Sequence, residues 1–246
     1  MGKVLFFGFL GLWILSGMFK DRLPGQEEIM PELFREPKQT PTENEPFSVK
    51  AKDIKYTITP LYNYELYGLI VSYHHSSVWW DLDHDQWKDY LNVKDLCVVW
   101  GENIKNGVYD RMTYHSGSWT CYMNWKDWDT GKLYHANALS NNHLLTADPD
   151  LSQKILKAQA GDQIYLKGHL VSYANGEGFQ RGTSITRDDE GDGACETVYL
   201  KDFKVLKPAN VMWRNVHQFS FWAIVGLIAF CFVKIISVPY RFKSNS

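Results

Sequence analysis

The chain has 246 residues, which is room for one ordinary domain with additional segments. Charged residues make up 22% and the formal net charge is −2, so the composition argues against wholesale disorder and does not point to nucleic acid. Aromatic residues are unusually frequent (10 Trp, 14 Tyr and 13 Phe), and such side chains favour strands and supply buried area in small β cores.

Apolar runs at both ends of the chain predict two membrane anchors. Residues 1–19 combine a basic start with an apolar stretch slightly shorter than the ~20 residues that a spanning helix usually needs. We interpret this segment as an uncleaved anchor, and a cleaved signal peptide is the alternative. Residues 218–238 are long enough to span, and Pro239 ends the run.

Positive charges near the second anchor predict its orientation. Lys234, Arg241 and Lys243 lie at or beyond its end, whereas Arg214 alone lies just before it. The tail at 239–246 is therefore expected in the cytoplasm. Since two spans place both ends on one side, the main domain is expected on the periplasmic face of a bacterial inner membrane.

The segment between the anchors divides into a linker and a domain. Residues 20–46 are rich in proline and glutamate, which predicts a solvated tether. Residues 47–210 are predicted to form a β-rich domain, because six stretches have the composition and alternation of strands. These stretches are 52–59, 64–73, 96–100, 119–125, 164–173 and 196–206.

Two short helical segments are expected in the domain. Asp148 followed by Pro149 is typical of a helix start, and the helix is predicted over 150–160. A second helical turn is predicted over 85–91, with Trp87 and Leu91 facing inward.

One stretch resembles a known fold family. The helix at 150–160 is followed by a Gly-Asp turn, an alternating strand to Tyr173, and a further strand over 197–206. This order resembles the last two strands of OB-fold barrels, and the resemblance is strongest from Asp150 to Leu206. It implies a mainly β fold, an OB-like barrel with one short helix before the last two strands, flanked by an N-terminal and a C-terminal transmembrane helix.

Many OB-fold domains bind nucleic acids, but the acidic residues between these two strands would repel a phosphate backbone. The resemblance therefore predicts the barrel fold but not the ligand, and nucleic acid is not expected as a partner.

The acidic stretch is the first candidate metal site. Asp188, Glu190 and Asp192 alternate before Gly193, like the start of a calcium loop. The twelfth position of that pattern is Tyr199 and not Glu, so a solvated acidic turn is the alternative.

A second stretch combines carboxylates with imidazoles. Asp81, Asp83 and Asp85 alternate around His84, and His74-His75 lie nearby. Such a set suits zinc or manganese, and two carboxylates also suit the acid and base of a hydrolase. The alternative is a polar cap in front of a short amphipathic helix.

Hydrogen-bond donors and aromatic rings suggest a ligand site. The candidates are Arg181, Arg187, Asn142, His143, Trp119 and Trp125. Exposed aromatic rings stack on sugars, and peptidoglycan is the polymer accessible to a domain outside the membrane. The stretch 140–143, which holds two of these residues, is expected to form a turn.

Three of the four cysteines lie in the exported part of the chain. A disulfide is predicted between Cys121 and Cys195, with Cys97 as a small core residue.

No Ser-His-Asp or Cys-His pattern, phosphate loop or CxxC motif occurs, so nothing in the sequence requires enzymatic activity or a cofactor. A divalent cation is the one cofactor that the acidic stretches suggest. We expect a membrane-anchored β-barrel module that mediates protein interaction or assembly, with a protein partner or a second copy of the chain. The alternatives are a glycan- or cation-binding module and a metal-dependent hydrolase.

Overall fold

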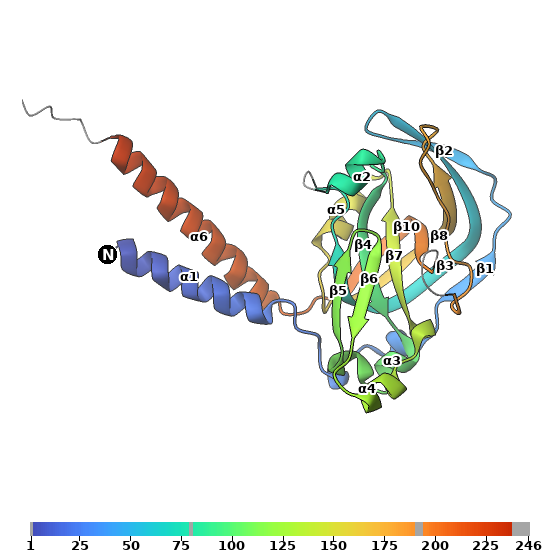
Figure 1. Ribbon diagram of the computed structural model, residues 1–246, viewed down its shortest axis with the longest axis horizontal. Helices are drawn as coiled ribbons and strands as arrows, with labels where there is room; N and C mark the ends of the chain where they lie inside the picture. The colour runs from blue at the N-terminus through green and yellow to red at the C-terminus, as the bar shows by residue number, and fades with distance from the viewer. Residues whose placement is uncertain (1, 79–80, 190–193, 238–246) are drawn as a thin grey trace, which may run out of the picture. The chain divides into compact units, whose positions relative to one another are not determined.

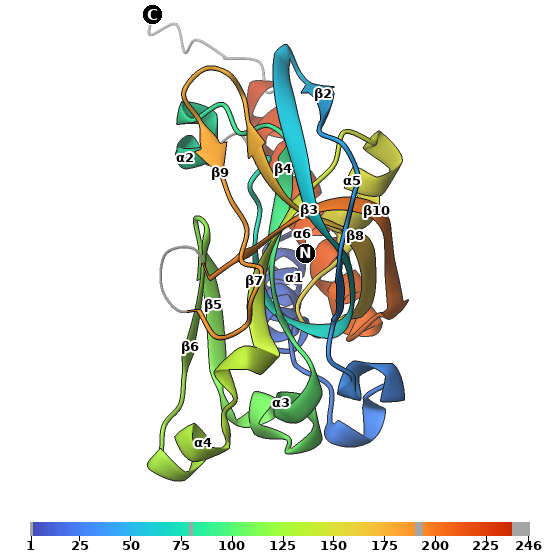
Figure 2. The ribbon, with the colours of Figure 1, turned by 90° about the vertical axis from the view of Figure 1, so that its right-hand side faces the viewer.

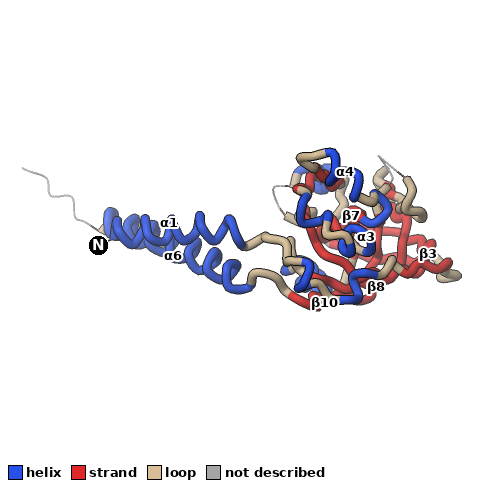
Figure 3. Tube along the Cα trace, turned by 90° about the horizontal axis from the view of Figure 1, so that it is seen from below, coloured by secondary structure: helices blue, strands red, loops and turns tan. Residues whose placement is uncertain are grey.

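The computed structural model describes residues 2–78, 81–189 and 194–237 (Figure 1). The chain separates into two compact units, one formed by the segments up to Arg22 and from Asn210, the other by Leu23–Ala209. Helices make up the terminal unit and strands most of the domain (Figure 3). Over the whole chain the structure is mixed and rich in sheet, with 35% strand and 36% helix, and the domain between the two terminal helices is mostly β.

The terminal unit consists of α1 (Gly2–Phe19) and α6 (Val211–Ile236). Both helices are long and apolar enough to cross a membrane, with mean hydropathies of 1.7 and 1.9, and their side chains are mostly exposed. The two helices contact each other at His217, whose ring lies within hydrogen-bond distance of the Ser16 hydroxyl and stacks on the ring of Trp13. The rings of Phe19 and Trp213 also stack between the helices.

The domain contains one eight-stranded sheet and a separate hairpin. The sheet consists of β1 (Lys38–Pro41), β2 (Phe47–Ala51), β3 (Ile54–His74), β4 (Asn92–Val99), β7 (Leu139–Leu145), β8 (Gln163–Ala174), β9 (Gln180–Arg181) and β10 (Glu196–Lys207). The hairpin consists of β5 (Thr113–Gly117) and β6 (Thr120–Asn124), and it lies beside β7 (Figure 2).

Short helices connect the strands. They are α2 (Leu82–Gln86), α3 (Gly101–Lys105), α4 (Trp128–Leu133) and α5 (Pro149–Lys157), with 3₁₀ turns at Gln26–Glu28, Pro31–Phe34, Val108–Arg111 and Ala136–Ala138.

Strand β3 organises the sheet because it pairs with two long neighbours. It is antiparallel to β8 over Thr57–Leu69 and to β4 over Leu69–His74. Strand β4 pairs with β7, β7 runs parallel to β10, and β10 pairs with β8. The series of paired strands thus begins and ends at β3. Because β3 pairs with β8 through its first part and with β4 through its last part, the sheet is not closed evenly.

Residues 20–46 do not form the solvated tether that their composition predicted. From Leu23 onward they belong to the domain, and Leu33 is fully buried beside Leu69 and Val99. The amide of Met30 donates to the side chain of Gln163 at 2.7 Å, which in turn donates to Glu28. A few apolar residues spaced among the prolines are enough to hold this segment against the sheet.

The local predictions for the helices have mixed outcomes. Helix α5 is confirmed, and Asp148 accepts hydrogen bonds from the amides of Asp150 and Leu151, as an N-cap does. Helix α2 ends before Trp87, which is exposed and not inward as predicted, whereas Leu91 is buried.

Several strand predictions need correction. The two stretches predicted at 52–59 and 64–73 form one strand, β3, with a register shift between Pro60 and Tyr62. The turn predicted at 140–143 is wrong, because these residues form the centre of β7 and are buried. Their polar side chains face a buried polar network, so the usual strand alternation of apolar and polar residues is missing.

Candidate functional site

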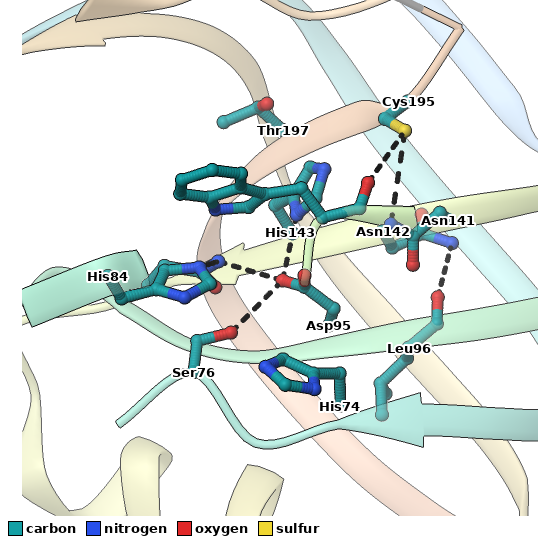
Figure 4. Close-up of polar contacts among 12 residues, drawn as sticks. His74, Ser76, His84, Asp95, Leu96, Asn141, Asn142, His143, Cys195 and Thr197 are labelled. Carbon is teal, nitrogen blue, oxygen red and sulfur yellow. Dashed lines mark hydrogen bonds and ion pairs between the residues drawn. The ribbon is translucent and has the colours of Figure 1, made fainter. Parts of the chain in front are cut away.

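A connected set of polar side chains runs through the interior of the domain (Figure 4). Strands β3, β4, β7 and β9 and helix α2 each contribute to it, and most of its members are buried. The set comprises His74, Asp81, His84, Asn92, Asp95, His143 and Arg181.

Asp95 is the centre of one half of this network. Its Oδ1 accepts hydrogen bonds from His143 Nδ1 at 2.7 Å, from the amide group of Asn92 at 2.7 Å and from the hydroxyl of Ser76 at 3.3 Å. Burial opposes ionisation of Asp95, but His143 and the hydrogen bond from Asn92 hold its pKa at about 2. Asp95 is therefore a buried carboxylate at neutral pH.

His143 connects this carboxylate to Arg181. The guanidinium of Arg181 donates to His143 Nε2 at 2.6 Å, and since arginine has no acceptor, that nitrogen must carry the lone pair. The ring proton is then on Nδ1, where it is donated to Asp95. Burial also lowers the pKa of His143, which agrees with a neutral ring. The result is a fixed relay from a buried carboxylate to a partly exposed cation.

Asp81 is the centre of the other half of the network. Its Oδ2 lies 2.7 Å from His74 Nε2 and 2.8 Å from His84 Nδ1, while its Oδ1 accepts from the backbone amide of His84 at 3.1 Å. His84 Nε2 lies 3.2 Å from the amide nitrogen of Asn92, which joins the two halves. Asp83 and Asp85, the other predicted metal ligands in this stretch, are exposed and lie outside the network.

A pocket of about 680 Å³ opens between the β5–β6 hairpin, the start of β7 and the segments around Arg181 and Cys195. Residues from all of these elements line it: Trp119, Tyr134, Asn141, Arg181, Asp189 and Cys195. The pocket thus presents aromatic rings, an amide, one cation and one carboxylate, and its volume is typical of small-molecule sites.

Trp119 adopts an unfavourable backbone conformation at the rim of this pocket. It occupies the hairpin turn with φ of 60°, a left-handed conformation that is strained for a bulky residue. Its ring lies 4.9 Å from that of His84 and 5.6 Å from the guanidinium of Arg181, and the Cys195 thiol donates to its carbonyl. The indole Nε1 is buried and has no hydrogen-bond partner among the described residues.

The six ligand residues predicted from the sequence do not form a single site in the structure. Trp119 and Arg181 line the pocket, and His143 lies directly behind Arg181. Asn142 donates instead to Ser140 in the interior, and its neighbour Asn141 faces the pocket.

The remaining two of the six also lie outside the pocket lining. Arg187 donates to the carbonyl of Pro37 and borders a neighbouring hollow, which shares Tyr134 and Asp189 with the pocket, and Trp125 packs beside Tyr134.

The predicted acidic calcium loop is described only in part. Asp188 is exposed and borders a hollow of about 340 Å³. Glu190 and Asp192 lie outside the described residues, so this site stays a prediction.

The predicted disulfide between Cys121 and Cys195 is wrong. Cys121 is bonded to Cys97, with a Cα–Cα distance of 5.7 Å, so the bridge joins the hairpin to β4. Cys97 is therefore more than a small core residue. Cys195 is a free thiol at the pocket, and burial raises its pKa.

Four residues of the network and the pocket were not among the site residues predicted from the sequence: Asn92, Asp95, Asn141 and Asp189. For Asp95 a signal was present, because Lys94-Asp95 interrupts a strand whose eight residues are all buried. Charged residues in a strand of that kind usually need partners in the interior.

Comparison with known proteins found no match to a family model, to a curated protein or to a solved structure.

Proposed function

We propose that the domain is a membrane-anchored binding module that holds an acidic sugar in the pocket between the β5–β6 hairpin and β7. The observation that carries this proposal is Arg181, a cation at the pocket wall whose orientation is fixed by a buried relay through His143 to Asp95.

The chemistry of Arg181 favours a carboxylate-bearing ligand. One of its terminal nitrogens is held by His143, and no other hydrogen-bond partner of the guanidinium is found among the described residues. A guanidinium presents several donors in a rigid plane that matches the geometry of a carboxylate. Because the relay holds this plane in place, little side-chain entropy is lost on binding.

The rest of the pocket suits a ring with hydroxyl groups. Trp119 and Tyr134 supply aromatic surface, and Asn141 and Asp189 supply donors and acceptors. Asp189 also places a negative charge in the same pocket, which disfavours highly charged anions such as a polyphosphate. A sugar with one acidic group suits both residues, since its carboxylate can pair with the Arg181 guanidinium and its hydroxyl groups can donate hydrogen bonds to Asp189.

This proposal places the sugar-binding alternative ahead of protein assembly, which stays a prediction. No observation on the pocket requires a second protein, whereas the pocket brings together Trp119 and Arg181 from the predicted ligand set. A metal-dependent hydrolase also stays a prediction.

We further infer an OB-like barrel for the domain and a periplasmic location for it. The order β3–β4–β7–β10–β8, the parallel pair β7–β10 and the position of α5 between β7 and β8 support the barrel. Positive charges at the end of α6 support a cytoplasmic C-terminus at a bacterial inner membrane. Peptidoglycan is then the polymer within reach, and its N-acetylmuramic acid units have a free carboxylate wherever the stem peptide has been removed.

The test is ligand binding by the full-length protein in detergent, followed through intrinsic tryptophan fluorescence and calorimetry. N-acetylmuramic acid is expected to bind, and Arg181→Ala is expected to weaken that binding by about 10- to 100-fold, since hydrogen bonds to charged groups contribute about 1.5–3 kcal/mol. Arg187→Ala is the matched control, because it removes the same charge outside the pocket. Absence of saturable binding to the folded wild-type protein would refute the proposal.

A further inference from the structure

We propose that His74, Asp81 and His84 form a binding site for a divalent transition metal of the zinc class. This site lies at the opposite end of the polar network from Arg181 and is separate from the sugar pocket. Four features of the structure support the metal site: the convergence of the ligand atoms, the elements that hold them, the surrounding charge and an open coordination position.

The three ligand atoms already converge. Each residue offers one ligand atom, and these atoms lie within 4.8 Å of one another. Asp81 Oδ2 lies 2.7 Å from His74 Nε2 and 2.8 Å from His84 Nδ1. Zinc binds imidazole nitrogen and carboxylate oxygen at about 2.0–2.2 Å, so its ligands lie roughly 3.3–3.5 Å apart. To make room for the ion, Asp81 Oδ2 has to move away from each ring nitrogen by less than about 1 Å, while the nitrogens of His74 and His84, now within 4.8 Å of each other, settle at a similar spacing.

Secondary structure and one backbone hydrogen bond hold these atoms in place. His74 is the last residue of β3, while Asp81 is the N-cap of α2 and His84 is in its first turn. The Asp81 Oδ1 that accepts from the His84 amide fixes the carboxylate, which leaves Oδ2 directed at both rings. Asp81 and His84 are buried, and the side chain of His74 is 24% exposed.

The surroundings supply negative charge and an acceptor for the second ring nitrogen. The ion pairs of Asp81 in the described part of the chain are those with the two histidines. Asp89 Oδ2 lies 3.9 Å from His84 Nε2, and Asp89 Oδ1 is buried without a partner among the described residues. When a metal occupies Nδ1 of His84, the ring proton moves to Nε2. Asp89 can accept this proton after a small approach from 3.9 Å, and the Asn92 amide nitrogen, 3.2 Å from Nε2, then has to turn away. Metal-bound histidines commonly have such a carboxylate behind them.

The fourth position opens toward a cavity. A cavity of about 400 Å³ is lined by Asp81 and His84 together with Ser76, Asp85 and Tyr90. Lys52 also borders it, but its ammonium lies over the Tyr90 ring at 3.6 Å. Water can thus complete a tetrahedral shell. Two imidazoles and one carboxylate suit zinc, cobalt or manganese better than calcium, which prefers six or more oxygens.

The experiment is metal titration of the full-length protein, purified in detergent without a histidine tag and treated with EDTA before dialysis. Zinc is added in a calorimeter, and cobalt is added in parallel to record the visible absorption of a tetrahedral site. The wild-type protein is expected to bind one equivalent of zinc and to melt at a higher temperature when zinc is present.

Variants distinguish this site from adventitious binding. His74→Ala, at the partly exposed ligand, is expected to weaken zinc affinity by at least tenfold and to abolish the zinc-dependent rise in melting temperature. Asp85→Asn, which changes an exposed carboxylate at the same cavity, is expected to leave both unchanged. Less than one equivalent of zinc in the wild-type protein, or equal affinity in His74→Ala, would overturn the proposal. Sugar binding is to be measured with EDTA present, which removes the metal, so the two proposals fail independently.

Discussion

Replacement of Glu196 by glutamine should remove a loss of stability that this protein undergoes as the pH rises. Glu196 begins β10, is almost fully buried, and its Oε2 has no hydrogen-bond partner among the described residues. Burial raises its pKa from 4.5 to about 8, although a hydrogen bond with Ser140 and the charge of Arg187 act in the opposite direction.

The direction of the effect follows from proton binding. Between pH 4.5 and about 8 the folded protein keeps a proton on Glu196 that the unfolded chain has released. The free energy of unfolding therefore falls as the pH rises through this window. Since one pKa unit corresponds to about 1.4 kcal/mol, the contribution lost by pH 8.5 is about 3–5 kcal/mol.

Glutamine is neutral at every pH and nearly the same shape, so Glu196→Gln should remove this loss. The variant and the wild type are expected to have similar stability near pH 5, and the variant should melt about 10 °C higher at pH 8.5. The assay is thermal unfolding of the full-length protein in detergent from pH 5 to 8.5, followed by tryptophan fluorescence. Glu43→Gln, an exposed carboxylate, is the control. A difference between variant and wild type that does not change with pH would refute the reasoning.

Two further predictions concern the disulfide and the topology. Replacing both Cys97 and Cys121 by alanine should lower the free energy of unfolding by about 3 kcal/mol, because the bridge spans 24 residues, whereas Cys195→Ala should have little effect. Non-reducing peptide mapping should recover a Cys97–Cys121 linked peptide, and a Cys121–Cys195 peptide would contradict the structure. For topology, Glu43→Cys in a protein lacking Cys195 and Cys231 should react with a membrane-impermeant maleimide in intact cells. Reaction only after lysis would place the domain in the cytoplasm.

Local sequence signals predicted those elements whose cause is local. Helix α5 has its cap, its proline and its stop within a dozen residues, and the structure confirms it. The two terminal apolar helices follow from composition alone. In contrast, β7 was missed because its polar residues are buried, and Asp95, the partner of His143, lies 48 residues away in the sequence.

The same limit applies to the site. Trp119 and Arg181 were selected from the sequence as residue types that bind ligands, and the structure places both in one pocket. Their connection to Asp95 depends on the pairing of β4 with β7, which no local pattern specifies. The disulfide was assigned wrongly for a similar reason, since the approach of the hairpin to β4 is a tertiary contact.

The most direct test of the central claim is the ratio of affinities for N-acetylmuramic acid and N-acetylglucosamine, two sugars that differ by one carboxylate-bearing substituent. The wild-type protein is predicted to prefer the acidic sugar by at least about tenfold, as expected for a charge-assisted hydrogen bond to Arg181. In Arg181→Ala this ratio should fall to about one, with Arg187→Ala unchanged. A wild-type ratio near one, or a preference that survives in Arg181→Ala, would contradict the assignment of Arg181 as the residue that recognises the ligand.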